Sequence, residues 1–364
     1  MKKREIIDGG IDMKFYDAAG GKYRYGVCPR CKEEARTMVL DVDTGIFTCM
    51  ACGFLGTTKR QTDIQKYLPA DSKIHKLNAA AGKIFTETLY TKYGNTALEY
   101  LKKRGITDEI IQRFGLGYAS NGKHARVELE KMGFSEEELI ASGIFKRNED
   151  GSLWFRFSGR VMFEIRDVKG RVIGFSGRVM DGGEPKYKNS PESEFFRKRN
   201  NLYGFDQAIY SEKKYIILCE GQMDIIAMHQ AGFTNAVATL GTALTEVQVR
   251  MIRNFTKCVV LLYDGDQAGE KATKKAIELF QNTGVEVFIA NTAPCKDPDE
   301  FLKTYGKDAV RKKIKAAITD LEYMVQLAVN EDGAPDYNEI SNILLKNYEP
   351  EKLKKLVEKK RNGQ

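Results

Sequence analysis

Short apolar runs alternate with segments of helical spacing through residues 211–303. Short runs rich in β-branched residues predict strands, and apolar positions three or four residues apart predict helices. The predicted strands and helices follow each other in turn, the strands at 215–219, 235–240, 258–263 and 285–290 and the helices at 223–232, 245–255 and 268–283. This alternation is typical of a compact parallel α/β domain.

The preceding segment, residues 77–210, has a different pattern. Helical spacing at 77–93 and 95–103 is followed by Thr107, a residue type that caps the start of a helix. Three runs of strand character come next and are joined by glycine-containing turns, at 154–157, 160–165 and 171–175. They predict an antiparallel sheet, so this segment is expected to be a mixed α+β subdomain.

Two polar segments complete the expected organisation. Residues 61–76 are polar and predict a linker. Residues 304–364 are rich in Lys and Glu at helical spacing, with breaks at Pro335 and Pro350. We expect this tail to form a small helical subdomain on the α/β domain, with its charges on a solvated face.

Two close cysteine pairs lie in the expected N-terminal domain, residues 1–60. Cys28 and Cys31 form the first pair, Cys49 and Cys52 the second, and the residues between them predict a hairpin. A hairpin would bring four sulfurs together at zinc-ribbon spacing, and four thiolates suit tetrahedral Zn²⁺ with no open position. The zinc would therefore be structural, in a ribbon that either contacts nucleic acid or only holds its own fold.

Composition narrows the class of protein. The 364 residues are 42% hydrophobic with a formal net charge of +8, which is typical of a soluble globular protein and favours a polyanionic partner. No apolar run is long enough to span a membrane and no secretion signal is visible, so we expect a cytoplasmic protein. The remaining cysteines, Cys219, Cys258 and Cys295, lie in or beside apolar segments and are predicted to be buried thiols.

Positive charge is concentrated in residues 151–204. This segment holds eleven lysines and arginines against six acids, a net charge of +5. Basic side chains beside aromatic ones provide what a single-stranded nucleic acid requires, namely charge for phosphates and flat faces for bases. The candidate flat faces are Phe175, Tyr187, Phe195 and Phe196. The alternative is a solvated strand face with part of the aromatic set in the core.

Acidic residues follow three of the predicted strands. Glu220 ends the first strand, Asp264 and Asp266 end the third, and Asp297 and Asp299 follow the fourth. Ligands of parallel sheets gather beyond the carboxyl ends of the strands, so these acids are expected to lie together. Mutual repulsion would then require cations, and oxygen ligands suit Mg²⁺. With a basic face nearby, the residues indicate nucleotidyl transfer or phosphodiester cleavage and leave both open.

The acidic segments resemble the motifs of a known family. Residues 220–224, 264–269 and 296–300 resemble the Toprim motifs of bacterial DnaG-type primases, the RNA polymerases that start DNA synthesis. Other segments are similar to the polymerase domain of that family, at 100–106, 114–118, 160–178 and 185–191. The order of zinc ribbon, basic subdomain and Toprim domain is also that of the family.

This resemblance implies a nucleotidyltransferase that makes RNA primers on single-stranded DNA from ribonucleoside triphosphates. It implies a catalytic site for Mg²⁺ or Mn²⁺ built from Glu220, Asp264, Asp266 and Asp297, with Asp299 nearby. It also implies a set of residues for the template strand and nucleotide phosphates, namely Arg160, Arg178, Lys186, Tyr187 and Lys198. The alternatives are a Toprim nuclease or topoisomerase-like enzyme and a non-catalytic DNA-binding recombination mediator.

Two features differ from the usual family pattern. Cys31 stands where the family's ribbon usually has histidine, which changes the charge of the ligand set and keeps tetrahedral zinc. The chain also ends soon after the helical tail, so a short form without the usual C-terminal helicase-binding domain is expected. A replicative helicase is then an expected partner through an unidentified contact.

Overall fold

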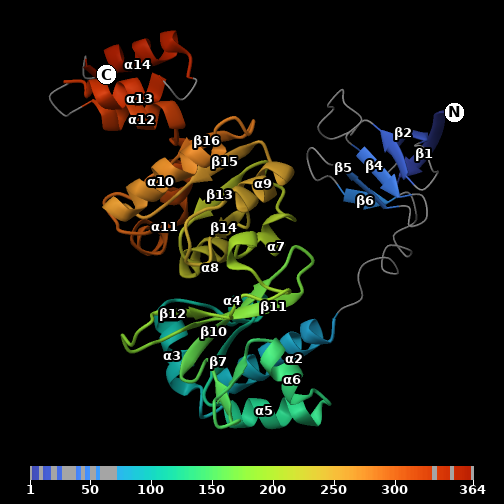
Figure 1. Cartoon of the computed structure of the whole chain (residues 1–364). Helices are drawn as coiled ribbons and strands as arrows, with labels where there is room; N and C mark the ends of the chain where they lie inside the picture. Colours follow the sequence, from blue (N-terminus) through green and yellow to red (C-terminus); the bar gives the residue numbers. More distant parts are fainter. Residues whose placement is uncertain are drawn as a thin grey trace. The chain divides into compact units, whose positions relative to one another are not determined.

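The computed structural model describes residues 2–7, 11–17, 23–26, 38–41, 46–49, 55–57, 72–329, 334–344 and 348–361. The chain divides into two compact units, Met1–Ser72 and Lys73–Gln364 (Figure 1). Each unit is described by itself.

The N-terminal unit contains antiparallel strands in the order β1-β2-β3-β4-β5-β6. Their bounds are Lys2–Ile7, Ile11–Asp17, Tyr23–Gly26, Met38–Asp41, Ile46–Cys49 and Leu55–Thr57. The pairing of Met38 with Cys49 confirms the hairpin that the sequence predicts between the cysteine pairs. The expected zinc ligands Cys28, Cys31 and Cys52 lie outside the described residues, and of Cys49 only the backbone is described. The zinc site therefore stays a prediction.

A helix-covered antiparallel sheet begins the second unit. Its strand order is β12-β11-β10-β7, and α2 packs on one face against β7 and β11. These elements span Lys73–Leu89 (α2), Leu116–Ala119 (β7), Arg160–Arg166 (β10), Val172–Arg178 (β11) and Tyr187–Asn189 (β12). Helix α2 begins inside the segment 61–76 that was expected as a linker. The flanking helices are α3 (Asn95–Lys103), α4 (Asp108–Phe114), α5 (Gly122–Lys131) and α6 (Glu136–Ala141).

One predicted strand belongs to a different sheet. Strand β9 (Leu153–Phe155) pairs only with β8 (Phe145–Arg147), in a separate hairpin. The prediction that residues 154–157 join the main antiparallel sheet is therefore wrong. Phe145 and Phe155 pack on the inner side of this hairpin with ring centroids 5.2 Å apart, and this burial holds the hairpin against the subdomain core.

The predicted α/β domain forms a sheet of order β14-β13-β15-β16-β17 (Figure 1). Its first four strands are parallel and β17 is antiparallel. The strands span Ile216–Cys219 (β13), Ala236–Ala238 (β14), Cys258–Leu261 (β15), Glu286–Ile289 (β16) and Ile318–Thr319 (β17). The helices span Gln222–Gln230 (α8), Glu246–Phe255 (α9), Gln267–Phe280 (α10) and Pro298–Lys315 (α11).

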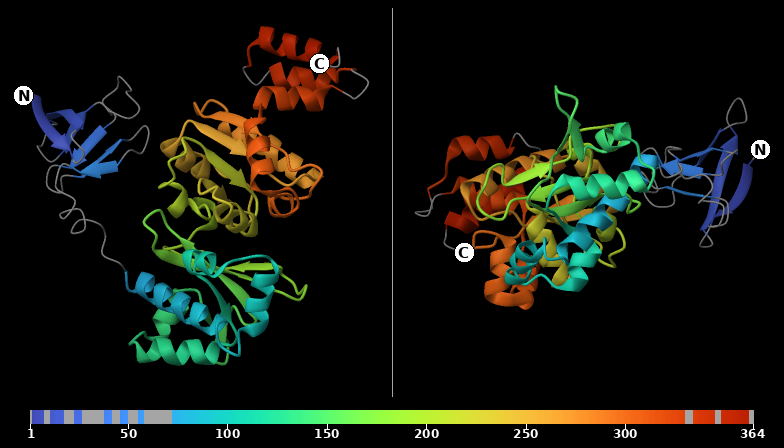
Figure 2. Two further views of the ribbon diagram at one scale, coloured as in Figure 1. Left: turned by 180° about the vertical axis from the view of Figure 1, so that it is seen from behind. Right: turned by 90° about the horizontal axis from the view of Figure 1, so that it is seen from below.

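Helices cover both faces of this sheet (Figure 2). Successive side chains of a strand point to opposite faces, so Ile217 and Cys219 pack with residues of α8 and α11 while Ile216 and Leu218 pack with residues of α9 and α10. Both faces are apolar, which is the usual condition of a parallel sheet. Cys219 is buried as predicted, whereas Cys258 and Cys295 are only partly buried.

A continuous core joins the α+β subdomain to the α/β domain. Between β12 and β13 the chain runs through the short helices η1 (Lys198–Asn200) and α7 (Phe205–Ala208). Phe114 of α4 packs against Tyr203 and against His229 of α8, with ring centroids 5.8 Å and 5.0 Å apart. This shared core fixes the two parts of the second unit side by side, and the candidate site lies where they meet.

The C-terminal helices pack on the α/β domain as expected. They are α12 (Asp320–Ala328), α13 (Tyr337–Leu344) and α14 (Pro350–Arg361). Leu321, Val325 and Leu353 belong to the same apolar cluster as α9 and α10. Among the described helices, none has the length and apolar content that a membrane span requires.

Candidate active site

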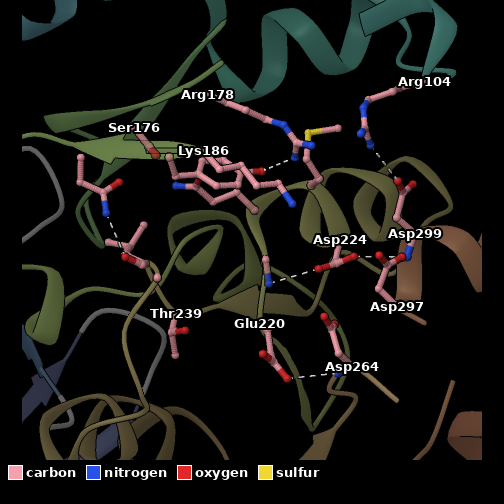
Figure 3. Close-up of a pocket in the computed structure, with 17 residues that line it drawn as sticks. Arg104, Ser176, Arg178, Lys186, Glu220, Asp224, Thr239, Asp264, Asp297 and Asp299 are labelled. Atoms are coloured by element: carbon pink, nitrogen blue, oxygen red, sulfur yellow. Dashed lines mark hydrogen bonds and ion pairs between the residues drawn. The ribbon is translucent and has the colours of Figure 1, made fainter. Parts of the chain in front are cut away.

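A pocket of about 300 Å³ opens between the α+β subdomain and the carboxyl ends of the parallel strands (Figure 3). Carboxylates come from one side and cationic side chains from the other. The charged residues in its wall are Arg104, Arg178, Lys186, Glu220, Asp224, Asp264, Asp297 and Asp299. The convergence of acids predicted from the strand ends is therefore present.

Glu220 and Asp264 lie at the ends of neighbouring strands. The backbone N–H of Asp264 donates to Glu220 Oε1 at 3.2 Å, which links the two loops (Figure 3). Burial is the main cause that raises the pKa of Glu220, and the charge of Asp266 adds to it. Burial, then Glu220 and Asp297, raise the pKa of Asp264 to about 6. The two carboxylates thus sit in an environment that disfavours their ionised forms without a cation.

Asp224 is a site residue that the sequence analysis left out of the ligand set. It stands in the first turn of α8, is only 8% exposed, and accepts hydrogen bonds from the backbone N–H groups of Gly221 (3.1 Å) and Asp299 (3.3 Å). Burial, then the charges of Asp297 and Asp264, raise its pKa to about 8. The sequence feature that could have identified Asp224 is its position four residues after Glu220, in the first turn of the following helix, which places it over the same edge of the sheet.

Asp297 and Asp299 mark the start of α11. Asp297 caps the helix by accepting from the backbone N–H of Glu300 at 2.8 Å. Asp299 Oδ2 accepts from Lys303 Nζ at 2.6 Å and lies 3.5 Å from an Arg104 guanidinium nitrogen. Asp299 is therefore already paired with two cations, one of them from the α+β subdomain.

Asp266 differs from the other predicted ligands. Its Oδ1 accepts from the backbone N–H groups of Ala268 and Gly269, both at 3.0 Å, and so caps α10. The side chain is exposed and is not part of the pocket wall. Its charge still raises the pKa of Glu220 and Asp264.

The cationic wall is organised around Arg178. Its guanidinium donates to the Tyr187 hydroxyl at 2.6 Å, and its central carbon lies 5.1 Å from the centroid of the Tyr187 ring and 5.9 Å from that of Tyr100. Lys186 is exposed at the rim of the pocket. Arg104 lies in the segment 100–106 that resembles the family, although the sequence analysis did not name it as a site residue, and its guanidinium carbon lies 5.1 Å from the centroid of the Tyr100 ring.

Two predicted nucleic-acid contacts lie outside the pocket. Arg160 is 8% exposed and donates to the carbonyls of Gly177 (3.0 Å) and Pro185 (2.9 Å), so it supports the loop before β12. Lys198 begins η1, half-buried, and its backbone N–H donates to Glu192. The structure thus brings Arg178, Lys186 and Tyr187 together and leaves these two apart.

Two of the four aromatic residues that were proposed as flat faces for bases are buried in the core instead. Phe175 and Phe196 are 0% and 1% exposed and belong to the core. Their selection as base-stacking surfaces is therefore wrong, because apolar residues of a sheet pack inward when that face is covered by a helix. Tyr187 is half-buried and lines the pocket.

The pocket has the chemistry of a divalent-cation site. Asp264 Oδ1 is buried without a hydrogen-bond partner in the described residues, and burial, followed by the charges of neighbouring carboxylates, raises the pKa of Glu220, Asp224 and Asp264. A cation would relieve both conditions. Within the part of the chain that the structure describes, no three His, Cys, Asp or Glu side chains form a ready-made metal-binding group. Donors spread around a wall suit Mg²⁺, which keeps several waters and binds through few carboxylates and substrate phosphates.

Comparison with known families supports this assignment. Residues 84–209 match the family described as "DNA primase catalytic core, N-terminal domain", and residues 217–302 match the family described as "Toprim-like". The solved structure of a DNA primase domain from Pseudomonas aeruginosa is 32% identical, with a TM-score of 0.67, over 80% of this chain and 95% of that one. The chain belongs to the DnaG primase family.

Other members of the DnaG primase family extend the comparison. The structure of the zinc-binding and RNA polymerase domains of the Aquifex aeolicus primase is 29% identical, with a TM-score of 0.70, over 94% of this chain and 90% of that one. A structure described as the DnaG primase catalytic domain bound to single-stranded DNA is 29% identical, with a TM-score of 0.66, over 80% of this chain and 98% of that one.

The curated DNA primase of Clostridium acetobutylicum is 34% identical over 340 residues, which are 85% of this chain and 56% of that protein. The chain thus spans little more than half the length of this DnaG primase. Its two family matches nevertheless cover both walls of the pocket, the cationic wall from residues 84–209 and the acidic wall from residues 217–302.

Proposed function

We propose that this chain is a DNA primase, a DNA-directed RNA polymerase that makes short RNA primers on single-stranded DNA from ribonucleoside triphosphates. The observation that carries the proposal is the single pocket in which acids from neighbouring strand ends face Arg178 and Lys186. Such a pocket can hold a metal ion and a triphosphate together. Membership of the primase family favours polymerisation over the other reactions of the Toprim fold.

The acidic wall would hold Mg²⁺ or Mn²⁺. Its proposed ligands come from three segments and are Glu220, Asp224, Asp264, Asp297 and Asp299, with Asp266 beside them. When bound, such an ion lowers the pKa of an attacking hydroxyl and neutralises charge on the phosphorus centre and the leaving pyrophosphate.

The cationic wall would bind the nucleotide and template. Arg178 and Lys186 provide positive charge for phosphates, and Tyr187 fixes the Arg178 guanidinium through a 2.6 Å hydrogen bond. A guanidinium held in this way keeps its fork oriented at little entropic cost. Arg160 and Lys198, which lie outside the pocket, remain proposed contacts for a longer template strand.

The N-terminal unit is proposed to be a zinc ribbon. The hairpin between the two cysteine pairs and the similarity to a primase that includes its zinc-binding domain support this proposal. The proposed ligands are Cys28, Cys31, Cys49 and Cys52.

A primer-synthesis assay tests the function. The chain is incubated with single-stranded DNA, labelled ribonucleoside triphosphates and either Mg²⁺ or Mn²⁺, and template-dependent RNA oligomers are expected. Asp264→Asn should lower the rate about 100-fold, because losing one metal ligand removes several kcal/mol of charge stabilisation. The matched control is Asp308→Asn, which changes an exposed aspartate of α11 that pairs with Arg311 and does not line the pocket. Absence of oligomers with either metal would refute the proposal.

The same reactions discriminate the alternatives. Metal-dependent nicking of the template without synthesis would indicate a nuclease, and a covalent tyrosyl adduct would indicate a topoisomerase-like enzyme. DNA binding that is indifferent to Asp264→Asn, with no synthesis, would indicate a recombination mediator.

A further inference from the structure

A second cavity adjoins the active-site pocket at the carboxyl ends of the parallel strands. Its volume is about 320 Å³, similar to the 300 Å³ of the active-site pocket, and the two cavities share Glu220, Thr239 and Gly241 in their walls. The rest of its wall comes from the loop after β14, from Tyr263 and from α10. We call this cavity the α10 pocket.

Glu220 stands between the two cavities. The strand that leads into it, β13, is the middle one in the order β14-β13-β15, so Thr239 and Asp264 lie on opposite sides of Glu220 (Figure 3). Asp264 lines the active-site pocket and not the α10 pocket, whereas Lys275 lines the α10 pocket and not the active-site pocket. A metal ion held by Glu220 and Asp264 would therefore have a cavity on each side.

The α10 pocket offers a cation and a hydroxyl group that have no partner. Lys275 is exposed and, within the described residues, forms no ion pair, whereas the neighbouring Lys274 pairs with Glu270 at 3.1 Å. Thr242 Oγ1 is buried and has no hydrogen-bond partner in the part of the chain that the structure describes.

Small side chains keep the α10 pocket open. Ala272 and Ala276 lie one turn apart on α10 and both line the cavity, so no large side chain fills its floor. A cation and a hydroxyl donor beside an open space are what the oxygens of a phosphorylated ligand require. A cavity that resulted from packing alone would need neither the unpaired Lys275 nor the shared wall at Glu220.

De novo synthesis gives a reason for a second nucleotide site. The first bond of a primer joins two nucleoside triphosphates, so both must be bound at once. The 3′ oxygen of the initiating nucleotide forms a bond to the α-phosphorus of the second, the bond from that phosphorus to the bridging oxygen breaks, pyrophosphate leaves, and the hydroxyl proton passes to water. The initiating nucleotide keeps its own triphosphate, and two triphosphates repel each other, which favours binding sites on opposite sides of the metal.

We propose that the α10 pocket binds the initiating ribonucleoside triphosphate, with the triphosphate at Lys275 and the 3′ hydroxyl at the Glu220 side. This inference deepens the proposed function and rests on it, because it identifies which of the two nucleotides the cavity holds. Arg178 and Lys186 of the active-site pocket then remain for the triphosphate that reacts.

Separate assays of initiation and extension test the proposal. A template whose first two copied bases differ lets the concentrations of the two nucleotides be varied independently. Lys275→Ala should raise the KM for the initiating nucleotide about tenfold, because a charged contact to phosphate is lost, and should change extension of an annealed RNA oligomer with a 5′ hydroxyl by less than about twofold. An unchanged KM for the initiating nucleotide, or an equal loss in both assays, would overturn the proposal.

Matched variants identify the cause of the loss. Lys275→Arg keeps the positive charge and should largely retain initiation. Lys274→Ala removes the neighbouring lysine of α10, which does not line the α10 pocket, and should initiate normally. The wild-type chain should use an initiating nucleoside triphosphate better than the unphosphorylated nucleoside, and this preference should shrink in Lys275→Ala. The same preference in both chains would contradict the assignment of Lys275 to the triphosphate.

Nucleotide binding can also be measured without synthesis. Labelled 3′-deoxynucleoside triphosphates occupy both sites but cannot be joined, because they lack the attacking hydroxyl. In equilibrium dialysis with template and Mg²⁺, the wild-type chain should bind about two of them, and Lys275→Ala should bind about one at the same concentration. One bound nucleotide in the wild-type chain at saturation would overturn the proposal.

The two proposals fail separately. Synthesis of RNA with an unchanged KM for the initiating nucleotide in Lys275→Ala would overturn the α10 pocket and leave the primase function. Absence of product in both initiation and extension would overturn the primase function, and the dialysis would still decide whether the α10 pocket binds a nucleotide.

Discussion

Asp224 has the most strongly raised pKa among the carboxylates of the pocket. It is buried among other carboxylates, and its pKa is raised from 3.8 to about 8. The protonated form is therefore favoured in the fold at pH values where an unfolded aspartate is ionised. The backbone N–H groups of Gly221 and Asp299 donate to its two carboxyl oxygens and hold the side chain in place within the acidic wall.

This protonation predicts how stability depends on pH. Without divalent metal, the stability linked to Asp224 is fully present below pH 3.8 and is lost as pH rises through about 8. The free energy of unfolding should therefore fall over this range, and Asp224→Asn should flatten the slope because an amide cannot ionise. Circular dichroism at several pH values with a chelator checks this. Mg²⁺ should bind more weakly as pH falls, and a slope identical in Asp224→Asn would contradict the assignment.

The cations of the pocket give a salt-dependent prediction. Arg178→Ala and Lys186→Ala should each weaken binding of single-stranded DNA or nucleotide at low salt, and the deficit should shrink as salt rises, because the lost contact is ionic. Anisotropy of a labelled oligomer at two salt concentrations measures this. The control is Lys307→Ala, which removes a lysine that belongs to α11 and does not line the pocket. An equal deficit at all salt concentrations would mean that the variant damages folding instead.

Single residues of the site were predictable only where local pattern placed them. Glu220, Asp264 and Asp297 end or follow apolar strands, and the geometry of a parallel sheet brings such positions together. Arg104 contacts Asp299, which is 195 residues away in the sequence, and no local sequence pattern predicts a contact at such a separation. Arg160 was chosen for its charge, but it is buried and one of its guanidinium nitrogens donates to the carbonyls of Gly177 and Pro185, which only tertiary structure reveals.

At the scale of elements, the turn from β15 to α10 depends on close packing. A Cβ at Gly269, in the first turn of α10, would overlap with the backbone carbonyl of Asp264. Glycine therefore lets the helix start directly behind the loop that carries Asp264. The loop and the first turn of the helix are thus in close backbone contact.

Gly269→Ala should displace Asp264 and lower primer synthesis more than it lowers stability. The overlap involves backbone, so relief requires a shift of the loop, and the expected loss of stability is about 1–3 kcal/mol. Thermal unfolding and the primer assay measure the two effects. Gly183→Ala is the matched control, since a Cβ there meets only Asp181 and Val179 at ordinary contact distances. Full activity of Gly269→Ala would show that the loop adapts.

Helices and apolar strands were predicted well, and polar strands were not. The strand predicted at 258–263 is β15, which starts at the predicted residue and ends two residues earlier, and the helix predicted at 268–283 is α10, whose ends differ by one and three residues. β12 was not predicted because Tyr187–Asn189 shows no alternation of apolar and polar residues. It forms a strand through its pairing with β11. β17 is likewise defined by its partner β16.

At the scale of the whole molecule, the two units should differ in what stabilises them. The unit Lys73–Gln364 has its own apolar clusters, whereas a unit as small as Met1–Ser72 generally needs a metal or disulfides in addition to its core. If the N-terminal unit is a zinc ribbon, the metal contributes its folding energy.

A strong chelator should therefore remove about one Zn²⁺ per chain and unfold the N-terminal unit alone. Metal analysis gives the stoichiometry, and thermal unfolding should keep the transition of Lys73–Gln364 unchanged. A chain in which Cys28 and Cys31 are both replaced by Ser should behave like the chelated protein. Loss of the main transition on chelation would contradict the separation into two units.

The order of strands in the parallel sheet has a consequence for synthesis on the ribosome. β13, which leads into Glu220, pairs on one side with β14 and on the other with β15, and β15 in turn needs β16. A chain emerges from its N-terminus, so β13 leaves the ribosome long before β15, and until then one edge of β13 keeps unpaired backbone N–H and C=O groups. The acidic wall is complete only once Asp299 has emerged. The nascent protein therefore completes its acidic wall only after the residues of the cationic wall that faces it have already been made.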